Sequence, residues 1–156
     1  MLYRKRPLSL AALLLFLFST VTPAPTFAAS VAAANSEQRE ETAENYVGQA
    51  LRVWQERLNL TNWDIHVQLV RPKALEPKTL GNIHWDLNSR QATIDVLSAY
   101  DYKLPLPEML NDMEFTVVHE LVHLHLASLP RSSATRMKEE YAVNQLARAL
   151  LNLAKH

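Results

Sequence analysis

Two histidines and a glutamate form the group in this sequence that is best suited to chemistry. His119 and His123 are four residues apart, and Glu120 directly follows the first histidine. On a helix, residues four apart lie on one face, one turn above the other. Both imidazoles can therefore reach one metal ion at about 2.0–2.1 Å, while Glu120 points partly aside, toward a metal-bound water. The spacing predicts a zinc centre, one ion per chain, with Glu120 as a catalytic group.

The residues around this motif predict that it is buried. They are apolar on nearly all sides of the expected helix: Phe115, Val117, Val118, Leu121, Val122, Leu124 and Leu126. Such a helix lies inside a protein, where histidine and glutamate are costly without partners. A metal ion supplies a partner. The alternative, three surface side chains that bind nothing, is disfavoured by these neighbours.

A catalytic zinc needs a third protein ligand and one position left for water. His125 is two residues past His123, about 200° around the helix, so it should face away. A later predicted helix offers Glu139 and Glu140, which point about 100° apart, so only one of them can face the metal.

Helix phase favours Glu140. It lies three residues before Val143, on the apolar stripe of that helix, and Asn144 follows one turn on. An asparagine there can accept the second N–H of a metal-bound histidine. We therefore predict His119, His123 and Glu140 as metal ligands. Glu139 is predicted to be a helix-start charge favoured by the dipole, and remains the alternative ligand.

The motif from His119 to His123, with Glu140 on a second helix, resembles the gluzincin class of zinc metallopeptidases. The run that follows Glu140 is also similar to the third-ligand helix of ImmA/IrrE-type metallopeptidases, although Leu146 stands where an aromatic residue is usual. The resemblance extends from Asp112 to Leu153.

This resemblance implies hydrolysis of peptide bonds in a peptide or protein substrate. Zinc would activate a water, and Glu120 would take its proton and pass it to the leaving amine. An extended substrate would add antiparallel to a sheet edge, expected at residues 92–96. The oxyanion donor stays open among four side chains: His84, Tyr100, Tyr102 and Tyr141. Two other functions also stay open, hydrolysis of a non-peptide amide and a binding module without catalysis.

Hydrophobic periodicity predicts the elements that position these residues. Val47, Leu51, Trp54 and Leu58 share one helix face. The fold class is predicted as α+β, zincin-like, with a small antiparallel three-stranded sheet packed on helices. The expected elements begin with a helix at 44–58. Strands follow at 63–70, 80–87 and 92–97, and the last two form a hairpin. One helix then runs from 108 or 112 to 127, and a last helix runs from 132 or 133 to 153.

The N-terminal residues predict export. Residues 1–28 combine Arg4, Lys5 and Arg6 with a 14-residue apolar run and small residues before a cut after Ala28, the order of a signal peptide. That run is shorter than the roughly 20 residues of a spanning helix, so stable membrane insertion is not expected after cleavage. Residues 29–43 are predicted to be a flexible linker, and 44–156 the metallopeptidase domain, in a periplasm or the medium.

Composition narrows the remaining classes. The chain has 156 residues and no cysteine, which excludes disulfides, thiolate-bound zinc and thiol catalysis. Three of its 16 basic residues lie within 1–28, leaving 13 against 16 acidic ones. No broad basic field remains, so no nucleic-acid partner is expected.

Overall fold

Three helices and a small sheet make up the described part of the chain, residues 27–129 and 133–154 of this computed structural model. The α+β class is as predicted. The elements follow in the order α1 (Phe27–Arg57), β1 (Asp64–Val70), β2 (Gly81–Asp86), β3 (Gln91–Leu97), α2 (Leu106–His125) and α3 (Ser133–Leu153), with short 3-10 helices at Pro72–Ala74 and Ala99–Asp101. Nearly all of the expected signal peptide lies outside the described residues.

The sheet has the strand order β1-β3-β2. β2 and β3 form the predicted antiparallel hairpin, with Ile83 opposite Ile94. β1, however, pairs with β3 in parallel, so the sheet is mixed and the expectation of an antiparallel sheet is wrong. The expected substrate edge at residues 92–96 is wrong too, because β3 is the central strand and β2 is an edge. Burial agrees, since Ile94 and Val96 are fully buried.

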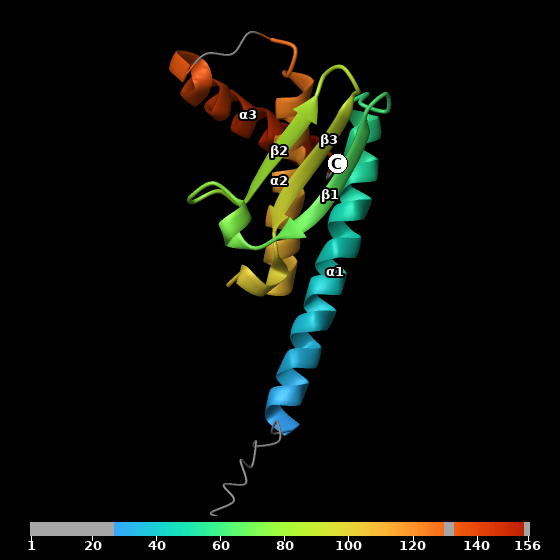
Figure 1. The fold of residues 1–156 in the computed structure, drawn as a ribbon, viewed down its shortest axis with the longest axis vertical. Coiled ribbons are helices and arrows are strands. Elements are labelled where there is room, and N and C mark those ends of the chain that lie inside the picture. Colours follow the sequence, from blue (N-terminus) through green and yellow to red (C-terminus); the bar gives the residue numbers. More distant parts are fainter. Residues whose placement is uncertain (1–26, 130–132, 155–156) are drawn as a thin grey trace, which may run out of the picture.

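Helices α1 and α2 pack on one face of the sheet and build the core (Figure 1). Val117 and Leu121 of α2 are fully buried in the same cluster as Ile94. Glu114 of α2 fixes α1, because it accepts hydrogen bonds from Trp54 Nε1 at 2.8 Å and from the Tyr46 hydroxyl at 2.9 Å. The site helix α2 is therefore held by contacts with both α1 and the sheet.

Helix α1 begins at Phe27, well before the expected Glu44, so that residues 29–43 are helix rather than linker. The segment 27–47 has no proline or glycine and is rich in alanine and glutamate, which favour helix. Its later part packs on the domain. Arg39 Nη2 donates to Leu104 O at 2.6 Å, and the Ser98 hydroxyl donates to Glu40 at 2.8 Å.

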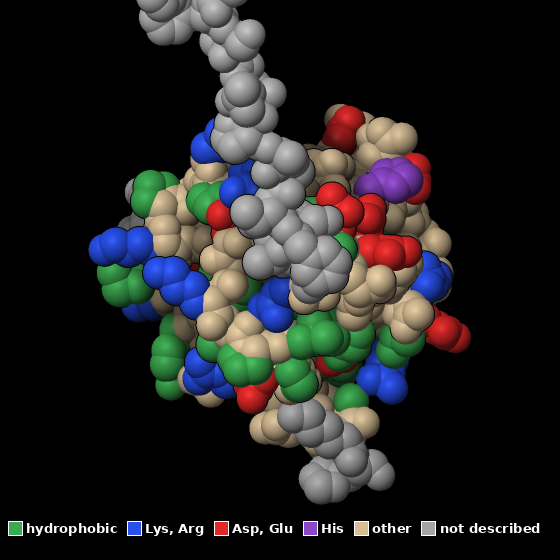
Figure 2. Space-filling model, turned by 90° about the horizontal axis from the view of Figure 1, so that it is seen from below, with side chains coloured by type: hydrophobic (Ala, Val, Ile, Leu, Met, Phe, Trp, Pro, Cys, Tyr) green, Lys and Arg blue, Asp and Glu red, His purple; other side chains and the backbone are tan. Residues whose placement is uncertain are grey.

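The surface carries mixed charge on the face seen from the end where α1 begins. There, Asp and Glu side chains lie beside Lys and Arg side chains, with hydrophobic side chains between them (Figure 2). Within the described ranges, no helix combines the length and the apolar character needed to cross a membrane.

Candidate metal centre

Helix α2 carries the motif. Half of its residues are buried, and its buried polar side chains are Thr116, Glu120 and His123. They follow one another at spacings of four and three, which places them on one face. The prediction that the motif lies on a buried helix is confirmed. His125 is exposed, as its helix phase predicted.

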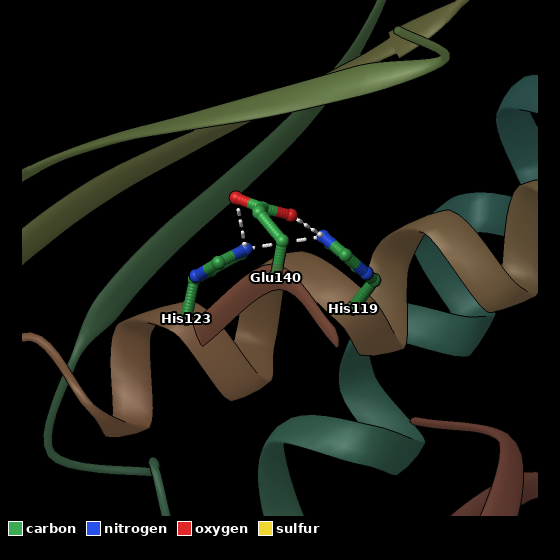
Figure 3. Close-up of side chains that lie close together, drawn as sticks. All are labelled: His119, His123 and Glu140. Atoms are coloured by element: carbon green, nitrogen blue, oxygen red, sulfur yellow. Dashed lines mark hydrogen bonds and ion pairs between the residues drawn. The ribbon is translucent and has the colours of Figure 1, made fainter. Parts of the chain in front are cut away.

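His119, His123 and Glu140 converge on one point, although Glu140 comes from α3 (Figure 3). The Nε2 atoms of the two histidines are 3.1 Å apart. Glu140 places Oε2 at 3.4 Å from His119 Nε2 and Oε1 at 3.3 Å from His123 Nε2. The three predicted ligand side chains thus form a triangle, in which one ligand atom from each residue lies within 4.8 Å of the others.

This triangle fits a tetrahedral zinc ion. Metal–ligand bonds of about 2.0–2.1 Å at tetrahedral angles separate ligand atoms by about 3.3 Å. The distances of 3.1, 3.4 and 3.3 Å between the side chains are close to this value, with the two distances to Glu140 ending on different carboxylate oxygens. Two imidazoles and one carboxylate are also a ligand set that zinc accepts, with a fourth position left open.

Glu139 contacts the site as well, through His123 and not as the alternative third ligand that the sequence left open. Its Oε1 lies 3.1 Å from His123 Nδ1, the nitrogen that faces away from the triangle. The expectation that Glu139 is only a helix-start charge is therefore wrong. A carboxylate on the outer nitrogen fixes the ring orientation and the tautomer of a metal-binding histidine. No local signal marks Glu139, because the contact depends on how α3 packs against α2.

His119 has a different environment. Burial, together with the neighbouring His123, lowers the pKa of His119 below its ordinary 6.5, while Glu140 and Asn144 act in the opposite direction. A neutral imidazole keeps its lone pair for a metal. Asn144 lies near His119, but Asn144 Nδ2 donates its hydrogen bond to Glu140 O at 2.9 Å. His119 Nδ1 has no partner among the described residues, so the predicted bond to Asn144 is not formed.

Glu120 lies one residue from the first histidine and is 6% exposed. Burial, and secondly the charge of Glu140, raise the pKa of Glu120 to about 8. A carboxyl group whose pKa lies near neutrality can both accept and return a proton. Its position and acidity suit the predicted role of a general base.

All of these side chains line a cleft of about 1020 Å³ between β2, α2 and α3. Thr79 to Trp85 form one wall. Of the four oxyanion candidates, His84 lines this cleft and the three tyrosines are not among its lining residues. His84 Nε2 lies 3.9 Å from Asp95 Oδ2.

Gly81 brings this wall close to the motif helix. A methyl group there would collide with Thr116 Cγ2, and would meet Asp95 O at 2.8 Å and Glu120 Oε1 at 3.5 Å. No larger residue fits without a shift of β2 or α2. This role of Gly81 was not predicted, although Gly81 is one of only two glycines in the chain, and an isolated glycine in a strand often marks a close backbone approach.

Comparisons with protein-family models, with curated proteins and with solved structures find no match for this chain. Functional inference therefore depends on the geometry of the site.

Proposed function

We propose that the protein is a zinc-dependent peptidase of minimal gluzincin type. The observation that carries the proposal is the triangle of His119, His123 and Glu140, with the buried Glu120 beside it in an open cleft. Bound zinc would supply a Lewis acid that polarises a carbonyl and acidifies a water.

The side chains of the chain would do the remaining work. The Glu120 carboxylate accepts a proton from the attacking water and returns it to the leaving amine. Its raised pKa keeps the proton available near neutral pH. Glu139 holds the His123 ring in place through Nδ1. The walls of the cleft shield Glu120 from bulk water.

The open edge of β2 supports a peptide as the substrate. Leu97 N donates to Leu80 O at 2.8 Å, and antiparallel pairs bond at alternate residues. The backbone groups of Gly81, Ile83 and Trp85 therefore point toward the open edge, beside Glu120. An extended peptide can add to this edge as a further strand, which replaces the expected docking at residues 92–96.

Two measurements on purified protein test the proposal. We expect about one zinc per chain by elemental analysis, lost in the double variant H119A/H123A. Glu120→Gln keeps the side-chain size and both histidines, so zinc should stay while cleavage of a diverse peptide library falls by about 10²–10⁴-fold. Zinc retained by the double variant would contradict the metal site. A zinc-loaded wild type that cleaves no peptide would contradict the peptidase and favour a non-peptide amide or a binding role.

We also propose that the protein is exported to a periplasm or the medium. The supporting observation is the order of charged, apolar and small residues in 1–28. Intact-mass analysis of protein recovered from the envelope or medium should find an N-terminus near Ala29. A mass that includes residues 1–28 would contradict cleavage.

A further inference from the structure

The cleft has positive charge in one region only. Lys78 and Arg136 are the only Lys or Arg side chains among the described residues that line it. Acidic side chains line other parts of it, including Asp112 on α2 and Glu139 on α3. A substrate with a negative charge therefore has one region of the cleft in which it can be stabilised.

Arg136 already holds a carboxylate there. Its Nη2 lies 3.1 Å from Glu76 Oε2, and the pair joins the loop before β2 to the first turn of α3. The two side chains are 68% and 62% exposed. Exposed ion pairs contribute little to stability, so a carboxylate brought by a substrate can replace Glu76 at small cost.

The loop that carries Glu76 and Lys78 is a fixed turn. Thr79 N donates to Glu76 O at 3.2 Å, and the Thr79 hydroxyl donates to the same oxygen at 2.8 Å. Pro77 occupies the second position, and Lys78 follows with φ 68°, the features of a type II turn. The turn presents both charges from a defined backbone, while Arg136 reaches over from the opposite wall.

The direction of β2 determines which part of a substrate meets these charges. A chain antiparallel to β2 has its C-terminal part beside Gly81, where the strand begins. The turn at 76–79 precedes that residue directly. Since Gly81 also lies against Glu120, residues just after the cleaved bond would approach Lys78 and Arg136.

We propose that Arg136, with Lys78 near it, binds a substrate carboxylate on the C-terminal side of the cleaved bond, and that Glu76 holds the guanidinium until that carboxylate replaces it. The inference rests on the proposed peptidase function. It assigns a substrate class, peptides that carry a negative charge shortly after the cleaved bond. The charge can come from a free C-terminus or from an acidic side chain.

Kinetics on matched peptides test this inference. Two sets of peptides are prepared from a peptide that the wild type cleaves. The first set compares a free C-terminal carboxylate with a C-terminal amide. The second set is amidated and compares Glu with Gln at each position after the cleaved bond. The measured quantity is the ratio of kcat/KM for the charged over the neutral peptide. We expect a preference for the charged form in the first set, which indicates the C-terminus, or in the second, which indicates a side chain.

Variants then separate a carboxylate-binding role of Arg136 from a purely structural role of its ion pair with Glu76. Arg136→Gln should lower the ratio about two- to fivefold through KM. Glu76→Gln frees Arg136 and should raise the ratio. If the ion pair of Arg136 and Glu76 only holds the loop before β2 against α3, both variants should change kcat/KM in the same direction, and equally for the charged and the neutral peptide. Lys138→Gln removes a neighbouring charge of α3 that does not line the cleft, and should leave the ratio unchanged.

The outcomes distinguish this inference from the proposed function. Zinc-dependent cleavage with equal rates on charged and neutral peptides leaves the peptidase intact and overturns the role of Arg136. Changes of the same sign in Arg136→Gln and Glu76→Gln overturn it as well. A wild type without zinc or without cleavage overturns the peptidase, and the inference with it.

Discussion

Glu120 is an acid placed where a charge is hard to solvate. Its side chain is buried beside Glu140, and both facts favour the protonated form. The same environment that makes it a suitable proton carrier therefore opposes its ionisation in the folded protein. This conflict has a measurable consequence for stability in the absence of metal.

We predict that Glu120 makes the stability of metal-free protein fall as pH rises. Its pKa is about 8 in the folded state against an ordinary 4.5, so the folded state binds the proton more tightly. The contribution is present below about pH 4.5 and is lost as pH rises toward 8, with a slope of up to about 1.4 kcal/mol per pH unit. Urea unfolding in chelator, wild type against Glu120→Gln, measures it. If the difference in the free energy of unfolding between the two proteins stays constant from pH 5 to 8, the prediction is wrong. Glu56→Gln, at an exposed position, is the control.

Glu139 and Glu140 should differ in how they support the metal. Glu140 provides two oxygens to the ligand triangle, so Glu140→Gln should lose most zinc affinity. Glu139 contacts the outer nitrogen of His123. Glu139→Ala should weaken zinc binding about 10- to 100-fold, and Glu139→Gln, which keeps an acceptor, should weaken it less. Competition with a zinc chelator gives the affinities, and Lys138→Gln serves as control. If the Glu139 variants lose more zinc affinity than Glu140→Gln, Glu139 is the ligand and Glu140 the supporting residue.

Strand β2 depends on Gly81 for its distance from α2. We predict that Gly81→Ala keeps zinc and loses most cleavage, because the new methyl group meets Thr116 Cγ2 and Asp95 O at less than 3 Å. Thr116→Ser removes that Cγ2 and keeps the hydroxyl bond to Asp112 O. The double variant should therefore recover part of the lost kcat/KM, while Thr116→Ser alone should stay near wild type. Full activity of Gly81→Ala would show that the close approach is not needed.

The sequence predicted those elements of the site that depend on local periodicity. His119 and His123 share a helix face because of their spacing, and the position of Glu140 follows from the apolar stripe that contains Val143. The pairing of β1 with β3 could not be read in this way, because strand order depends on contacts between distant segments. The contacts of Gly81 with Thr116 and of Glu139 with His123 depend on the same tertiary packing.

The molecule as a whole holds its last helix by a narrow interface. Val143 and Ala147 are fully buried in α3, while Met137, Tyr141 and Leu153 are 83%, 69% and 75% exposed. Helix α2, by contrast, is buried against α1 and the sheet. The ligand triangle joins these two unequal parts, since Glu140 is on α3 and both histidines are on α2. A bound metal would therefore tie α3 to a core that is already stable.

We predict that removal of the metal loosens α3 first. Ligand binding to the folded state stabilises it by about 4 kcal/mol at a free zinc concentration a thousandfold above Kd, so a chelator should lower Tm by several degrees. Hydrogen exchange should rise most in 139–151 and least in β3 and the centre of α2, because regions with few buried contacts open at lowest cost. The double variant H119A/H123A should already show high exchange in α3 and no response to chelator. Equal exchange in α3 with and without zinc would mean that packing alone holds the helix, and a uniform rise along the chain would mean that the metal stabilises all elements alike.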